Sequence, residues 1–555
     1  MYSDLFIFII FYFLAIFSTL GYGFIFEKLI SSKNYQLNLG FIGLGGLLFL
    51  ILYSLISHYF IAHNITHNII INLIGLIAFS LFFKSRKKEF LILISVFTIL
   101  IISFFIFKTH DDFPYYHFPY TLYITENSSI FGIGLLNHGF KTPSSIFYFN
   151  SLFFLPYIEY YLFQIGALLI FGFSTLILLY DIKKKIKINE IDFDFFLKLF
   201  SLCFILIFFY RVQEHGTDRS GQILILLFIT EIINIRKNYT LFNINISKLI
   251  ILLTLIIGLK LFFLLYLIFV IPFILYLNKD KKLFLLIDIF KNKLFYFSVL
   301  SFLIYIFTYF VNTGCFLFPV SFTCLESFSW SLNIEEVKKL RLHYENWAKA
   351  GSGAGYQNID QINYVKDFNW LQNWMDRYFF NKVSDFILGI IFLCLIMSTF
   401  FIRKKSIKQK NFSYSFYYLT IIILFFEWFF NHPALRYGGY TIIALLFFIP
   451  ISSHITKFQS TNKITSKVLI LIFISFLIFS SRNVSRLNEE INLYGYKPGI
   501  KPFYYLDQSH FRVQKEIRNL VTEYKNCNLS SNNCNELNGS KKVIYKFGKY
   551  IITNK

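Results

Sequence analysis

The segment FLILISVFTILIISFFIFKTHDD, residues 90–112, decides how the chain folds. Its apolar part, residues 90–107, is long enough to cross a bilayer as a helix. Backbone polar groups in hydrocarbon must be paired within the segment, so such a run is predicted to be α-helical. The run ends on two adjacent acids, Asp111 and Asp112, which mark the point where the chain leaves the membrane.

Similar apolar runs recur along the whole chain. Of the 555 residues, 56% are hydrophobic and only 15% are charged. A soluble domain of this length needs more charge to cover its surface, and barrel strands would alternate between polar and apolar residues. The composition therefore predicts an all-α polytopic membrane protein. The first run lacks a small-residue cleavage site after it, which indicates a retained helix rather than a signal peptide.

The hydropathy pattern predicts about fourteen transmembrane helices. They are expected at residues 5–26, 38–60, 67–83, 89–107, 160–180, 195–210, 221–235, 246–259, 261–277, 294–311, 384–402, 413–430, 438–455 and 468–481. The run at 246–277 is divided at Lys260 because a single crossing would place the later basic clusters on the wrong side of the membrane.

The net charge of +22 is concentrated in basic clusters between the apolar runs, such as KSRKK at 84–88 and KKKIK at 183–187. This distribution follows the positive-inside rule and does not indicate a nucleic-acid partner. It places both termini outside the cytoplasm, and we expect the membrane to be a bacterial inner membrane.

This topology divides the chain into five parts. They are additional N-terminal helices at 1–88, a core at 89–311 with an acidic external loop at 108–159, a large external loop at 312–383, C-terminal helices at 384–481 and a small external tail at 482–555. Two further external turns, 211–220 and 431–440, carry charged residues at the same face.

The cysteines agree with an oxidising external side. Cys203 and Cys394 lie alone in predicted membrane helices, as small apolar residues. The other four occur as close external pairs: Cys315 with Cys324, and Cys527 with Cys534. Such pairs are typical of disulfides in the periplasm, although four free thiols are also compatible with the sequence.

The acid pair is the first candidate for chemistry. Asp111 and Asp112 lie between His110 and His117. Neighbouring like charges raise each other's pKa, so one carboxylate can act as a general base. The pair could instead hold a divalent cation such as Mg²⁺ or Mn²⁺ through its oxygens, or it could be an interfacial loop that is merely acidic.

Thr142 and Pro143 predict the start of a helix, followed by an aromatic-rich amphipathic segment along the membrane interface at 144–157. His138 and Lys141, just before it, could meet an anionic group at the helix N-terminus. The alternative is a simple interfacial anchor.

The turn EHGTDRSG, 214–221, places His215, Asp218 and Arg219 at the same face. They are predicted to form another wall of the site, or else an Asp–Arg pair that only neutralises itself.

Two cations complete the set of candidates. Lys260 interrupts an apolar run, and an intramembrane lysine is a functional hypothesis by default, although it could also extend harmlessly to the interface. Arg436, in NHPALRYGGY at 431–440, offers a guanidinium fork that binds phosphate through two bonds. We expect Lys260, Arg436 and the neighbouring Tyr437 to contact substrate.

The acid pair in HDD, 110–112, after a helix that runs from inside to outside, resembles the GT-C superfamily of integral-membrane glycosyltransferases. The seven helices of 89–311 and the large loop that follows, which begins NTGCFLFPVSFTC at 312–324, resemble that family's layout. The resemblance implies that Asp111 or Asp112 is catalytic. It also implies that a sugar moves from a polyprenyl-phosphate-linked donor to a glycan, lipid or protein acceptor at the periplasmic face.

Two other classes remain open. O-antigen polymerases and ligases share the helices, the large loop and the arginines, but lack an acid pair in the first core loop. A lipid or polysaccharide flippase or other transporter would place charges near mid-bilayer and would show related halves.

Overall fold

The computed structural model describes residues 3–30, 37–235, 239–351, 360–402, 414–458, 463–529 and 541–554. Within these ranges, ten helices are long and apolar enough to cross a membrane, and Glu89–Phe105 and Ser415–Asn431 are shorter apolar helices. The chain is therefore a polytopic helical protein, as predicted. Helices also occupy the other two predicted crossings, but both carry buried charged side chains, so the number fourteen stays a prediction.

The helices of the first half are α1 (Ser3–Ile30), α2 (Leu39–His58), α3 (Ile65–Phe82), α4 (Lys87–Leu100), α5 (Phe118–Glu126), α6 (Ser145–Ser151), α7 (Ile165–Lys187), α8 (Phe193–Phe208), α9 (Asp218–Ile235), α10 (Phe242–Leu259), α11 (Val270–Lys279), α12 (Leu286–Lys291) and α13 (Lys293–Thr313). Those of the second half are α14 (Ile334–Lys349), α15 (Gln361–Val365), α16 (Leu371–Trp374), α17 (Ser384–Phe401), α18 (Ser415–Asn431), α19 (Gly439–Phe458), α20 (Ile464–Tyr494) and α21 (Arg512–Leu529). One antiparallel hairpin, β1 (Lys542–Lys546) and β2 (Lys549–Thr553), ends the chain.

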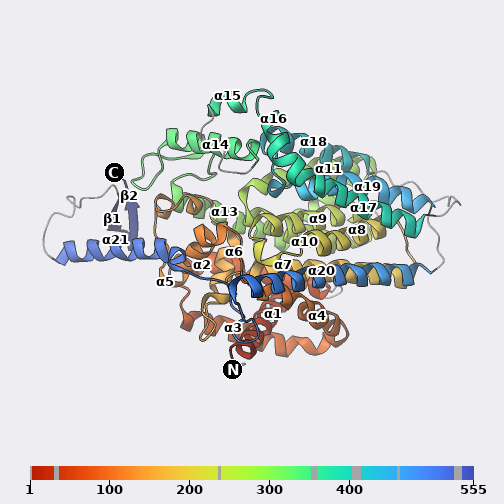
Figure 1. The fold of residues 1–555 in the computed structure, drawn as a ribbon, viewed down its shortest axis with the longest axis horizontal. Coiled ribbons are helices and arrows are strands. Elements are labelled where there is room, and N and C mark those ends of the chain that lie inside the picture. Colours follow the sequence, from red (N-terminus) through yellow and green to blue (C-terminus); the bar gives the residue numbers. More distant parts are fainter. Residues whose placement is uncertain are drawn as a thin grey trace.

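Short 3₁₀ and π turns connect these helices. Those used below are η2 (Ile101–Phe105), η3 (Phe113–His117), η5 (His138–Lys141), η7 (Val212–Glu214), η9 (Leu261–Phe269), η13 (Met375–Val383) and η14 (Leu435–Tyr437). In Figure 1, α20 runs along the bundle, and α14, α21 and the hairpin all lie toward the left of the picture.

Glycines bring the first three helices close together. A Cβ added at Gly21 of α1 would lie 1.8 Å from the carbonyl oxygen of Gly75 in α3, and one added at Gly46 of α2 would lie 2.0 Å from the carbonyl oxygen of Thr19. These distances are too short for any side chain. The small residues thus permit the backbone contact by which membrane helices associate.

The predicted break at Lys260 is present. Lys260 is extended, with φ −158° and ψ 126°, between α10 and η9. A helix end leaves carbonyl groups without partners. One of these, the carbonyl of Leu259, accepts a 2.7 Å hydrogen bond from Ser144 Oγ.

The predicted interfacial helix at 144–157 is wrong in position and setting. Ser144, not Thr142, occupies the N-cap, and the helix, α6, ends at Ser151. All seven of its residues are buried, because α6 packs against α2, α5 and α7. Its polar side chains find partners inside the protein, because Asn150 Oδ1 accepts from the Gly166 amide at 2.9 Å and Ser151 Oγ lies 2.7 Å from His63 Nδ1, so burial on every side is possible.

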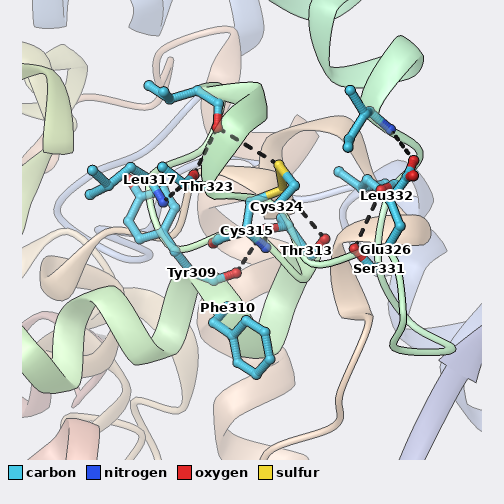
Figure 2. Close-up of a disulfide and its surroundings, with 12 residues drawn as sticks. Tyr309, Phe310, Thr313, Cys315, Leu317, Thr323, Cys324, Glu326, Ser331 and Leu332 are labelled. Atoms are coloured by element: carbon cyan, nitrogen blue, oxygen red, sulfur yellow. Dashed lines mark hydrogen bonds between the residues drawn. A yellow bond between two sulfur atoms is a disulfide. The ribbon is translucent and has the colours of Figure 1, made fainter.

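The predicted Cys315–Cys324 disulfide is formed at the end of α13 (Figure 2). It packs with Tyr305 and Tyr309 of α13 and with Val337 of α14, so this loop supports the start of α14. Cys203 and Cys394 are buried free thiols, as expected. The predicted pair of Cys527 and Cys534 lies outside the part of the chain whose side chains the structure describes.

Candidate functional site

A cavity of about 300 Å³ lies where the acidic loop, the turn before α9, η13 and η14 meet. All four segments border helix ends. The cavity is lined by His110, Asp111, Asp112, His117, Glu214, His215, Gly216, Thr217, Asp218, Arg219, Trp347, Tyr378, Lys382, Arg436 and Tyr440. The acid pair, the turn EHGTDRSG and Arg436, far apart in the chain, are thus brought to one place.

Four side chains form what we call the outer ionic cluster: Asp112, Asp218, Lys260 and Arg436. Arg436 Nη2 lies 2.7 Å from Asp112 Oδ2, and Arg436 Nε lies 2.7 Å from Asp218 Oδ2. Lys260 Nζ lies 2.6 Å from Asp218 Oδ1. The cluster contains two carboxylates and two cations, so its formal charge is zero.

The turn that carries Arg436 is held from several sides. Gln222 of α9 donates to the carbonyl of Arg436 at 3.1 Å, and the Leu435 amide donates to the Tyr378 hydroxyl at 2.8 Å. Gly438 has φ +105°, a left-handed conformation that favours glycine. These constraints fix where the guanidinium points before any ligand binds.

The cations decide the charge state of the acids. Burial raises the pKa of the Asp112 carboxyl, but Arg436 together with His117 and His110 outweighs burial and holds this pKa below its usual value. Burial also opposes ionisation of Asp218, yet Lys260 and Arg436 hold its pKa well below the usual range. Both acids therefore stay ionised at neutral pH and are weak proton acceptors.

The two acids of the predicted pair differ. The side chain of Asp111 is exposed, and no described residue pairs with it, whereas Asp112 is bound to Arg436. His110 Nδ1 accepts a 3.0 Å hydrogen bond from the Asp112 amide, which fixes the bend between them. Asp111 is thus the carboxylate in this loop that is available to a ligand.

Three histidines line the cavity: His110, His117 and His215. Burial lowers the pKa of His117 to about 3, and that of His215 to about 3 as well. Both are neutral at physiological pH. His215 Nε2 lies 2.7 Å from the carbonyl of Phe209, which requires the proton on that nitrogen.

Arg436 already binds one oxygen of the acid pair that is predicted to hold a divalent cation. Arg436 lies against Asp112 Oδ2, where a metal bound by the acid pair would meet a positive charge. No group of three or more His, Cys, Asp or Glu side chains with metal-like spacing occurs among the residues that the structure describes.

Two other cations of the cavity wall, Arg219 and Lys382, are bound less tightly by carboxylates than Arg436 is. Arg219 Nη1 lies 3.6 Å from Glu214 Oε2, a loose ion pair, and no carboxylate of the described chain pairs with Lys382. The ring of Trp347, from α14, lies 5.2 Å from the guanidinium carbon of Arg436. Arg219 and Lys382 are therefore better placed than Arg436 to receive an anionic ligand.

Four predicted substrate-binding residues lie off the cavity wall. Lys260 lies behind Asp218, with the Tyr437 ring 4.7 Å from its ammonium. Lys141 pairs with Glu336 of α14 at 2.7 Å, and His138 packs against Tyr344. His138 and Lys141 thus anchor α14 rather than sit at a helix N-terminus, because η5 ends before α6 begins.

The sequence analysis missed the wall supplied by the large external loop: Trp347, Tyr378 and Lys382. Four tryptophans in that loop were a signal of a packed surface, but nothing in their spacing indicates which one reaches the acids. Tyr440 was missed as well, although it lies close to Arg436 in the chain.

A second set of buried charges, which we call the inner ionic cluster, was also missed. It lies at the opposite ends of α7–α10 and consists of Asp181, Lys185, Asp194, Lys198, Glu231 and Lys248. Lys198 Nζ lies 2.5 Å from Asp181 Oδ2, 2.9 Å from Glu231 Oε1 and 3.6 Å from Asp194 Oδ2.

Fold and site together define a polytopic helical membrane protein with a charged cavity where helix ends meet. A family model described as a domain of unknown function (DUF8201) matches residues 5–443, so the chain belongs to that family. No curated protein and no solved structure matches the chain.

Proposed function

We propose that the protein is a membrane glycosyltransferase. It would move a sugar from a polyprenyl-phosphate-linked donor to a glycan, lipid or protein acceptor at the external face of the bacterial inner membrane. One observation carries the proposal: a single cavity combines the unpaired carboxylate of Asp111 with the cations Arg219 and Lys382. Its outer ionic cluster is fixed in advance by ion pairs.

The chemistry needs both kinds of group. The acceptor hydroxyl oxygen attacks the anomeric carbon, its proton passes to Asp111, and the bond from that carbon to the phosphate oxygen breaks. The leaving polyprenyl phosphate keeps the electron pair. Arg219 and Lys382 stabilise the charge that develops on it.

In this scheme the paired acids have a different role from Asp111. Asp112 and Asp218 are weak bases because of their cations, but they hold Arg436 beneath the Trp347 ring. A fixed guanidinium and an aromatic ring offer hydrogen bonds and an apolar face to a sugar ring. These residues would orient the sugar and need not exchange protons.

The test compares transfer from a polyprenyl-phosphate sugar by the full chain in native-like membranes. Asp111→Asn is expected to lower the rate about 10²–10⁴-fold, as expected for removal of a general base. Asp112→Asn is expected to lower it less, through Arg436. Glu523→Gln, an exposed acid on α21, is the matched control. Unchanged rates in both aspartate variants, with an active parent, would overturn the proposal.

A further inference from the structure

The outer part of α20 reaches two walls of the cavity. This helix is apolar at its start and carries charged residues in its last turns. Arg486 and Glu490 lie one turn apart and pair with each other, with Arg486 Nε 3.3 Å from Glu490 Oε1. Their side chains are 12% and 8% exposed, whereas Arg482 and Glu489 on the same helix are exposed. The two buried residues therefore face inward.

Glu490 holds the base of the acidic loop. Its Oε2 accepts a 2.7 Å hydrogen bond from the amide of Phe107, and the amide of Lys108 lies 3.4 Å from both carboxylate oxygens. These amides follow η2, where a helix end leaves N–H and C=O groups in need of partners. The Phe107 carbonyl accepts in turn from the Tyr505 amide at 3.0 Å. The chain is thus held three residues before Asp111.

Arg486 connects this loop to the opposite wall. Its Nη2 lies 2.7 Å from Glu214 Oε1 and donates to the carbonyl of Lys108 at 3.2 Å. Glu214 lines the cavity and lies 3.6 Å from Arg219. One guanidinium therefore links the loop of the acid pair with the turn that carries the cation Arg219.

The acidic loop is consequently held at two points. Arg436 binds Asp112 at one end, and α20 binds Phe107 and Lys108 at the other. Asp111 lies between these points and has no described partner of its own. Its position relative to the cavity is set by the two anchors.

We propose that Arg486 and Glu490 are positioning residues for Asp111 and Arg219, an inference that rests on the proposed glycosyl transfer. They act through the backbone of residues 107–108 and through Glu214, and they do not touch the substrate. They lie beyond residue 443, where the family match ends, so the C-terminal part of the chain completes a site formed by the matched part.

Two measurements on the full chain in nanodiscs test this inference: amide hydrogen exchange at residues 107–112 and the kinetics of glycosyl transfer. Glu490→Gln is expected to speed exchange at Phe107 and Lys108 about tenfold, because the charged acceptor is lost. We expect kcat to fall about tenfold and KM to stay within about twofold, because the cations that hold the donor remain. Glu489→Gln, at the exposed neighbour, is expected to change neither.

Unchanged exchange in Glu490→Gln, or a raised KM with unchanged kcat, would overturn the inference. If Glu490→Gln lowers the yield of folded protein, Arg486→Lys replaces it, with Arg482→Lys as its control. Arg486 contacts Glu490 through Nε and contacts Glu214 and the Lys108 carbonyl through Nη2. Lysine has one donor nitrogen and does not reproduce both positions, so exchange at residues 107–112 should still rise. An inactive parent would refute the proposed glycosyl transfer, and hydrogen exchange alone would then decide whether α20 holds the loop.

Discussion

Helices α9 and α10 border an ionic cluster at each end, and the two clusters differ in exposure. In the inner cluster, the side chains of Lys198, Glu231 and Asp194 are 2%, 1% and 0% exposed, and Asp181 and Lys248 at its edge are 16% exposed. Each of its carboxylates lies 3.0 Å or less from a lysine ammonium. In the outer cluster, Arg436 and Asp112 are 26% and 25% exposed and face a cavity. Oppositely charged side chains pair in both clusters, but only the outer cluster faces a cavity that a ligand can enter.

The difference separates two uses of buried charge. Removing ions from water is costly, and only close pairing offsets that cost. A closed cluster can therefore specify which helices pack together but offers nothing to a ligand. A cluster that faces a cavity can still form hydrogen bonds with a ligand. Asp111 and Arg219, which line the same cavity, are less tightly paired than the members of the cluster and are available for such bonds.

The largest expected effect breaks the closed cluster. Lys198→Met leaves Asp181, Asp194 and Glu231 without their shared cation. We expect the free energy of unfolding to fall by about 3–5 kcal/mol, as for other buried pairs that lose one partner. Thermal unfolding in detergent measures this. Lys338→Met, at an exposed lysine of α14, is the control, and equal stability of the two variants would contradict a structural role for the inner cluster.

An intermediate effect is expected at the open cluster. Arg436→Lys keeps the charge, but one ammonium cannot replace the two nitrogens that bind Asp112 and Asp218. The transfer rate should fall about 10–100-fold, while stability falls less than in Lys198→Met. A variant that unfolds as readily as Lys198→Met would show that the two clusters serve the same purpose.

The smallest expected effect concerns pH. Burial lowers the pKa of His117 and His215 to about 3, below the unfolded value of about 6.5. The unfolded chain then binds more protons as pH falls through 6.5, so stability decreases, by about 1.4 kcal/mol per histidine at pH 5.5. The acids Asp112 and Asp218 have lowered pKa values, and their contribution is lost only below about pH 4.

Unfolding midpoints between pH 7.5 and 5.5 check this prediction. His215→Gln removes one titrating ring and should flatten the slope. His454→Gln, at an exposed position of α19, should leave it unchanged. Equal slopes for the parent and His215→Gln would show that His215 is already protonated in the folded state.

Hydropathy and charge were enough to predict most of the fold. Apolar runs identify helices because backbone N–H and C=O groups in hydrocarbon must be hydrogen-bonded within the segment. The distribution of basic residues among the loops predicted the break at Lys260. The same signals failed for α6, where a segment with both apolar and polar residues is buried rather than interfacial. For α8 and α9 they predicted the helices but not the buried charged side chains that these two helices carry.

The site was predicted in its members but not in its pairings. The acid pair, Asp218, Lys260 and Arg436 were each singled out as contacts of a substrate, but the ion pairs that join them to one another were not predicted. Asp112 and Arg436 are 324 positions apart, and local pattern carries no information about such a contact. The contacts of Arg486 and Glu490 with the acidic loop are likewise distant in sequence and could not be predicted. Their spacing of four residues on α20 does predict that they pair with each other.

The spread of the outer cluster along the chain gives its assembly an order during synthesis. Membrane segments emerge from the ribosome in sequence, and domains generally fold from the N-terminus onward. Asp112 and Asp218 are made first, Lys260 next, and Arg436 only with the turn before α19. A nascent chain that lacks that turn holds two carboxylates and one cation of the cluster, so Asp112 stays without its guanidinium partner until the turn is made.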